Sequence, residues 1–235
     1  MIDLAEDMHV HSTFSDGRGS LADNVAAATA AGLARLGCVD HVRRDSAWLP
    51  AFVAAVREAQ ATTAIELRLG VEAKFLDGHG RLDVPADLAG VARVYAADHQ
   101  VPFGDGCHSP RQVRTWLTTG EVTAAAIVTT LVDATLAAAA SYPLVVAHLW
   151  SVLPKIGLSE DDVAEVELRR LADGLARAGA EVEIDEQWSS PGIRTARVMR
   201  DAGVQLRASS DAHLPERIGV YAHVRDVERA LGAGR

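Results

Sequence analysis

The fold is decided by a stretch near the amino terminus, which reads Asp7-Met-His-Val-His11-Ser-Thr-Phe-Ser-Asp16-Gly17. It places two imidazoles and a carboxylate directly after a short apolar run at residues 2–8. Alternate residues of an extended strand point the same way, so His9 and His11 can share one metal ion. The pair is not specific by itself, and its meaning depends on the residues that come after the other apolar runs of the chain.

Seven short apolar runs alternate with longer helical patterns. The runs occupy residues 2–8, 34–39, 65–71, 91–97, 144–147, 180–184 and 204–208. The helical patterns occupy residues 21–31, 48–61, 110–117, 121–140, 160–178 and 192–202. Such alternation predicts βαβ units and a parallel sheet, and seven strands without a break in composition favour a barrel. We therefore expect one α/β barrel domain that covers residues 1–235.

Local signals mark several boundaries of the predicted elements. Ser20 with Asp23 and Ser159 with Asp162 predict helix caps, and Gly32, Gly179 and Gly203 lie where helices should end. Residues 77–90 and 102–110 are rich in Gly and Pro and predict long loops, which in barrels often shape access to a site.

Metal-binding residue types come after six of the seven predicted strands. They include six of the nine histidines and two acids: His9, His11, His41, Glu72, His99, His148, Asp211 and His213. The carboxyl ends of barrel strands meet on one face, so we expect these side chains to converge. A lone buried His148 is more often part of a polar network, and Glu72 alone fits a strand-end ion pair. Their conjunction favours a site for zinc, manganese or iron, which accept mixed imidazole and carboxylate ligands.

Four segments resemble the successive motifs of the polymerase and histidinol phosphatase (PHP) superfamily. They are residues 7–17, Val39-Asp-His41, Gly70-Val-Glu72 and Ser209-Ser-Asp-Ala-His213. The resemblance implies a distorted (β/α)7 barrel that holds two to three divalent metal ions, which are zinc, manganese or iron.

The resemblance also implies a ligand set. His9, His11, Glu72 and Asp211 would hold the first metal; Glu72, His99 and His148 the second; Asp16, His41 and His213 the third. Two placements have alternatives, since Asp16 also fits a turn before a helix. Asp98 could replace His99 or orient it from outside.

The function that this resemblance implies is hydrolysis of a phosphate monoester on a small metabolite, as in histidinol-phosphate phosphatases. Two bridged metals lower the pKa of a bridging water, the nucleophile, and clamp the phosphoryl oxygens. Glu72 would set the metal spacing, and Asp211 or His213 could pass a proton to the leaving group. Candidate phosphate contacts are Lys155, Arg217, Arg18, Arg43 and the adjacent Arg44, although surface solvation is the ordinary role of each.

Other functions stay open at this point. A phosphodiesterase or nucleotide phosphatase of the same superfamily fits the Ser15-Asp16-Gly17 form of the motif. A PHP module without activity would require lost ligands, and none is missing. A metal-dependent amidohydrolase would require a carbamate lysine, but neither Lys74 nor Lys155 is expected at a strand end in the required way.

Composition limits the partners and the compartment. The formal charge of −9 argues against broad nucleic-acid binding but allows a small phosphorylated substrate. Two cysteines and an amino terminus without a signal pattern favour a reducing cytoplasm. The apolar tract at residues 122–140 is interrupted by threonines and an aspartate, which predicts a buried helix rather than a membrane span. The oligomeric state is left open.

Overall fold

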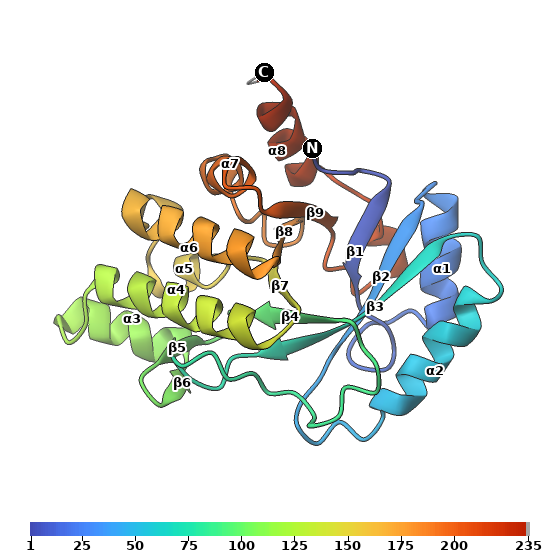
Figure 1. Ribbon diagram of the computed structural model, residues 1–235, viewed down its shortest axis with the longest axis horizontal. Helices are drawn as coiled ribbons and strands as arrows, with labels where there is room; N and C mark the ends of the chain where they lie inside the picture. Colours follow the sequence, from blue (N-terminus) through green and yellow to red (C-terminus); the bar gives the residue numbers. More distant parts are fainter. Residues whose placement is uncertain (234–235) are drawn as a thin grey trace.

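Seven parallel strands form a nearly closed barrel in the computed structural model, which describes residues 1–233 (Figure 1). Their order around the barrel is β1-β2-β3-β4-β7-β8-β9. The strands span Glu6–Val10, Arg35–His41, Glu66–Lys74, Arg93–Ala97, Leu144–Ala147, Glu181–Asp185 and Gln205–Ser209. The two ends of the sheet meet where the His11 amide donates to the Ala212 carbonyl at 2.9 Å. The predicted distorted (β/α)7 barrel is confirmed.

Helices surround the barrel and supply most of its outer apolar surface. They are α1 (Leu21–Ala30), α2 (Leu49–Gln60), α3 (Pro110–Thr119), α4 (Ala124–Ser141), α5 (Leu153–Ile156), α6 (Glu165–Ala178), α7 (Ile193–Asp201) and α8 (His223–Gly232). In Figure 1, α1 and α2 lie on one side of the strands, while α3, α4 and α6 lie on the other. Short 3₁₀ turns occupy Glu160–Asp162 and Pro215–Arg217.

Three segments differ from the sequence-based expectation. Residues 102–110 hold an antiparallel hairpin, β5 (Val101–Phe103) and β6 (Gly106–His108), whose two-residue turn is Gly104-Asp105. Gly followed by Asp is a known hairpin-turn pair, so this signal was readable. The helix expected over 160–178 is split, because Val163 and Ala164 have extended ψ values. Helix α8 was not expected, although Val224, Val227 and Leu231 are buried at helical spacing.

The predicted caps are present. Ser20 and Asp23 form a capping box on α1, and Ser159 and Asp162 form another that caps the 3₁₀ turn instead of α6. Gly179 ends α6 with a φ of 66°, in the left-handed region where only glycine is free of steric cost.

Helix α4 is the one helix of the described residues that is long and apolar enough to cross a membrane. Eight of its side chains are buried, among them Ile127, Leu131 and Val132, and it packs against α6 and β5. This placement agrees with the expected buried core helix.

A bulge in β1 sets the first metal-binding residues of the chain in place. Asp7 pairs with Leu36 of β2, and Val10 pairs with Cys38. Two residues of β1 therefore stand opposite the single residue Gly37, so β1 contains one extra residue. Bulges re-aim side chains and are frequent beside active sites. The Met8 carbonyl accepts a hydrogen bond from the buried Tyr95 hydroxyl at 2.7 Å and lies against Gly37, where a side chain would collide with it. Gly37 thus provides the space that the bulge requires.

The substitution Gly37→Ala tests this packing. A new methyl group would overlap the Met8 backbone, so β1 must shift or strain. Overpacking lowers the free energy of unfolding by about 1–3 kcal/mol. Because the new methyl group would contact backbone, we expect a loss at the upper end of this range or above it. Gly106→Ala is the control, since its added carbon meets nothing within 4 Å. Equal free energies of unfolding in urea for the two variants would contradict the role of Gly37.

Candidate metal centre

The carboxyl ends of the strands bring all nine predicted ligands into three groups. The groups are His9, His11 and Asp211; Glu72, His99 and His148; and His11, Asp16, His41 and His213. Within each group one potential ligand atom of every residue lies within 4.8 Å of the others. The groups follow the expected division of ligands with two differences: Glu72 falls only in the second group, and His11 also faces the third.

The first group lies where the barrel closes. His11 Nε2 is 3.0 Å from Asp211 Oδ1, and His9 Nε2 is 4.0 Å from the same oxygen. His9 lies in β1 and His11 follows its last residue, while Asp211 follows β9 with a φ of 50°. Strained backbone of this kind is retained where the surrounding structure holds it, often at functional sites.

Glu72 stands between the groups, as expected for a residue that bridges two metals. Its Oε1 lies 3.2 Å from His148 Nε2 and 3.4 Å from His99 Nε2. Its Oε2 lies 3.3 Å from His11 Nε2, 3.4 Å from His9 Nε2 and 2.8 Å from His41 Nδ1. One buried carboxylate therefore faces imidazoles from four different strand ends.

The third group faces solvent through Asp16. The carboxylate lies 3.4 Å from both His41 Nε2 and His213 Nε2, and 3.8 Å from His11 Nδ1. Its side chain is 55% exposed, so this group forms the open side of the centre. The buried Asp40 carboxylate accepts hydrogen bonds from the amides and hydroxyls of Ser12 and Ser15, which shapes the loop that carries Asp16.

Three buried atoms at the middle of the centre have no hydrogen-bond partner among the described residues. They are His9 Nε2, His11 Nδ1 and Glu72 Oε2; the short approach of Glu72 Oε2 to His41 lacks hydrogen-bond geometry. Buried polar atoms are nearly always paired, and leaving one unpaired costs about 1–3 kcal/mol. His9 Nε2 and Glu72 Oε2 face each other at 3.4 Å, whereas His11 Nδ1 is turned toward Asp16 at 3.8 Å. Unpaired imidazole and carboxylate atoms in such positions fit bound cations.

A second set of contacts holds the ligands from outside. Glu183 of β8 lies 3.0 Å from His9 Nδ1. The Ser151 hydroxyl lies 2.9 Å from His148 Nδ1 and donates to Asp98 at 2.6 Å. Asp98 therefore orients His148, whereas its place in the sequence suggested a role beside His99. Glu183 was not among the predicted site residues, although it lies near a strand end, as His9 does.

The protonation of the centre follows from burial and charge. Burial lowers the pKa of His99 to about 4, so its ring is neutral at pH 7. Burial acts to raise the pKa of Glu72, but the imidazoles of His9, His148 and His41 outweigh it and hold this pKa well below its ordinary value. The carboxylates around them outweigh burial and raise the pKa of His9, His148 and His41. These rings must therefore lose protons when cations bind, because ionised carboxylates and neutral imidazoles are the forms that bind metals.

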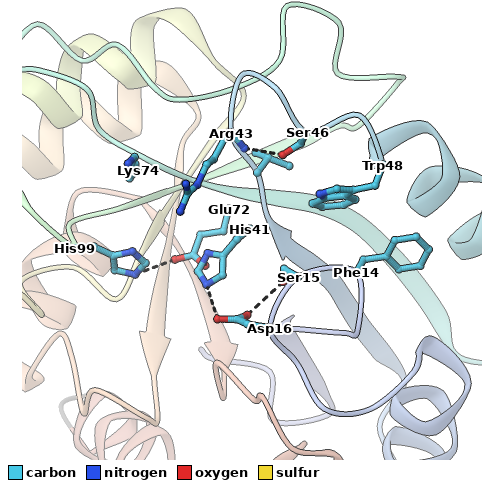
Figure 2. Close-up of a pocket in the computed structure, with 11 residues that line it drawn as sticks. Phe14, Ser15, Asp16, His41, Arg43, Ser46, Trp48, Glu72, Lys74 and His99 are labelled. Atoms are coloured by element: carbon cyan, nitrogen blue, oxygen red, sulfur yellow. Dashed lines mark hydrogen bonds and ion pairs between the residues drawn. The ribbon is translucent and has the colours of Figure 1, made fainter.

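A cavity of about 550 Å³ opens beside the centre (Figure 2). Glu72, His41, His99 and Asp16 form its floor. Phe14 and Trp48 stand together on one side, and Lys74 lies on the other beside His99 (Figure 2).

The basic residues predicted to bind phosphate are spread around this face. Arg43 lines the cavity and extends over Glu72 (Figure 2), and its guanidinium forms no ion pair within residues 1–233. Arg44 pairs with Asp83 at 3.3 Å. Lys155 is half-buried, with its ammonium 3.8 Å from the Trp188 ring centroid.

The other two predicted contacts lie farther out. Arg217 lines a separate cavity of about 340 Å³ beside Glu186 and Gln187. Arg18 is exposed, and its amide donates to the His213 carbonyl at 2.8 Å. Lys74 is the last residue of β3, although no lysine was expected at such a position, and it lies 4.0 Å from Asp83.

The sequence pattern of the PHP domain matches residues 7–186, which is most of the chain. The chain belongs to the PHP domain family. This assignment agrees with the resemblance seen in the four motifs, of which three lie inside the matched range.

Three solved structures are similar to the chain, and the first of them agrees with the barrel. The histidinol phosphate phosphatase from Lactococcus lactis, in complex with zinc, L-histidinol and phosphate, has a TM-score of 0.67 at 17% identity, over 97% of this chain and 92% of that one. An uncharacterized protein has a TM-score of 0.42 at 13% identity, over 97% and 69% of the two chains. A D-hydantoinase has a TM-score of 0.41 at 11% identity, over 87% and 45%. A sequence search of the curated proteins gives no match.

In this PHP domain, we expect Glu183→Gln to weaken metal binding. The amide cannot hold the His9 ring as a carboxylate does, and changes at such outer positions typically cost 10- to 100-fold in affinity, so we expect a loss of about that size. Competition with a chelating dye measures it. Glu181→Gln, in the same strand but paired with Arg93 and Arg207, is the control and should keep its affinity. Indistinguishable affinities for the two variants would contradict the role of Glu183.

Proposed function

We propose that the chain is a metal-dependent phosphatase that hydrolyses a phosphate monoester of a small metabolite. The observation that carries this proposal is the set of buried, unpartnered ligand atoms of His9, His11 and Glu72 at the centre of nine converging ligands. Membership of the PHP domain family supports it, and so does the similar fold of a histidinol phosphate phosphatase that was solved with zinc and phosphate.

From the three groups we propose the ligands of two to three divalent ions, which we take to be zinc, manganese or iron. The first ion is assigned to His9, His11 and Asp211, with Glu72 shared between this ion and the second. The second ion is assigned to Glu72, His99 and His148. The third is assigned to Asp16, His41 and His213, at the side open to solvent.

When bound, such ions supply an activated water and positive charge for the phosphoryl oxygens. The protein residues set where this happens. Glu72, with one oxygen toward each of two groups, fixes their spacing. His213 Nδ1 lies 3.0 Å from the Asp211 carbonyl, so a proton there leaves Nε2 free to act as ligand or base. His213 stays the candidate proton donor to the leaving group when its Nε2 does not hold the third ion. Asp211 is disfavoured for that role, because its Oδ2 accepts two hydrogen bonds and its Oδ1 faces the first ligand group.

The cavity fits the size and charge of a small phosphate ester. Its volume of about 550 Å³ lies within the range of small-molecule sites. Arg43 is the cation that lines it without an ion pair among the described residues, and we propose it as the main protein contact of the phosphate. Lys155, Arg217 and Arg18 stay predictions as phosphate contacts at greater distance.

A second candidate is a nucleotide phosphatase or phosphodiesterase of the same superfamily. The paired rings of Phe14 and Trp48, with centroids 5.9 Å apart on one side of the cavity, favour it because a base could stack there. The complete ligand set disfavours a non-catalytic module. We expect the enzyme to work in a reducing cytoplasm on small substrates.

Phosphate release from a panel of phosphorylated metabolites tests the proposal, with zinc, manganese and iron supplied separately. We expect activity that a chelator abolishes and that added metal restores. Elemental analysis should find at least one metal ion per chain. Well under one ion per chain, together with no activity after metal addition, would contradict the function.

The matched variant for this test is Glu72→Gln. Loss of the shared carboxylate should lower kcat by at least about a hundredfold, or about 2.7 kcal/mol in the barrier, while the protein stays folded. Glu58→Gln on the exposed face of α2 serves as the control. Near-normal turnover of the Glu72 variant would show that the bridge is wrongly assigned.

A second test compares two adjacent arginines. Arg43→Ala should raise KM about tenfold to a hundredfold with little change in kcat, because a charge-assisted hydrogen bond to phosphate contributes about 1.5–3 kcal/mol in ground and transition states alike. Arg44→Ala is the control, since its guanidinium pairs with Asp83. Equal KM values for the two variants would remove Arg43 from the phosphate site.

A further inference from the structure

The two oxygens of Asp211 have different surroundings. Oδ1 faces the first ligand group, at 3.0 Å from His11 Nε2. Oδ2 points away from it and accepts two hydrogen bonds, from the Gln187 side-chain amide at 3.1 Å and from the Trp188 indole N–H at 3.0 Å. Two donors occupy both lone pairs of a carboxylate oxygen, so Oδ1 is the oxygen left for a cation.

Asp211 needs such external support. Its φ of 50° lies in the left-handed region, outside strand β9, so regular strand geometry does not set the direction of its side chain. The direction of the Asp211 side chain is instead fixed by its burial and by the N–H groups of Gln187 and Trp188.

The segment that carries these donors is itself firmly anchored. The Trp188 amide donates to Asp185 Oδ1 at 2.8 Å. The backbones of Asp185 and Ser190 pair in both directions, at 2.7 and 3.2 Å, which closes the turn between them. Gln187 and Trp188 therefore stand on a short, tied turn at the end of β8, and not on a loose loop.

The indole ring also joins other parts of the centre. The Lys155 ammonium lies 3.8 Å from its centroid, and the His148 ring centroid lies 5.9 Å away. A cation over an indole face is attracted to its π electrons and holds the ring in place. Trp188 thus links the ends of β7, β8 and β9 through one side chain.

We propose that Gln187 and Trp188 are positioning residues that hold Asp211 so that it binds metal through Oδ1 alone. Their two N–H groups occupy Oδ2 and fix the plane of the carboxylate. Without them Asp211 can rotate or present both oxygens, which alters the first metal site. This inference rests on the proposed metal-dependent function and adds residues to it that none of the four sequence motifs contains.

The test uses Trp188→Phe, which keeps an aromatic face for Lys155 but lacks the N–H, and Gln187→Met, which keeps the length but lacks the amide. Zinc affinity is measured on the purified full chain without substrate, by competition with a chelating dye. We expect about a 10-fold loss in each single variant and a larger loss in the double variant. With 4-nitrophenyl phosphate as substrate, kcat should fall while KM changes little.

Two controls separate positioning from general damage. Trp116→Phe, in α3 and remote from the ligand groups, should keep wild-type affinity. Cobalt(II) bound in place of zinc reports coordination directly, since its visible absorption weakens when a second oxygen joins the metal. We expect that weakening in the Trp188 and Gln187 variants, with thermal unfolding close to wild type.

The outcomes distinguish the two proposals. Wild-type protein that binds no metal contradicts the proposed function itself. Wild-type protein that binds metal, with a folded double variant of equal zinc affinity and unchanged cobalt spectrum, overturns the positioning role and leaves the function standing. If Trp188→Phe strongly lowers the stability of the protein, the zinc affinity and cobalt spectrum of Gln187→Met alone decide whether the positioning role holds.

Discussion

The carboxylate of Glu72 is the constraint on which the rest of this barrel depends. It is 1% exposed, and its two oxygens face five imidazoles that arrive from the ends of β1, β2, β4 and β7. A buried ionised carboxylate is costly unless positive charge meets it in good geometry. The converging strands bring imidazoles to this carboxylate only when their carboxyl ends lie at the same level along the barrel axis. Fold and metal centre are therefore parts of one arrangement.

The residues beneath the metal centre hold the strand ends at that level. The bulge in β1 turns His9 and His11 toward Glu72, and Gly37 and Tyr95 together hold the Met8 carbonyl at the bulge. The opposite end of the barrel is filled differently. There Glu6 and Glu181, both buried, pair with arginines from other strands of the barrel: Arg35, Arg93 and Arg207. Charge at the amino ends is neutralised within the protein, whereas charge at the carboxyl ends is left for cations.

Function follows from which parts of the centre are closed and which are open. The first group is buried, and the second is buried except for His99, whose side chain is 36% exposed. Glu183, Ser151 and Asp98 hold His9 and His148 from outside, which favours well-oriented ligands. The third group opens through Asp16 to the cavity that Arg43 and Trp48 line. In the proposed function a phosphate ester enters through this cavity, with a cation and an aromatic wall beside it.

The sequence alone provided the seven strands, the resemblance to the family and the set of candidate ligands, because most of these ligands lie within a few residues of a strand end. A position near the end of a strand can be recognised from the local sequence. In a barrel such a position is enough to bring the ligands together, because the carboxyl ends of the strands meet on one face. The tertiary structure decided which imidazole faces which oxygen of Glu72, the role of Gly37, and the contacts of Glu183, Gln187 and Trp188. It also revealed the β5–β6 hairpin and α8. The contacts depend on the register between strands far apart in the chain and on side-chain directions, which no local pattern of residues encodes.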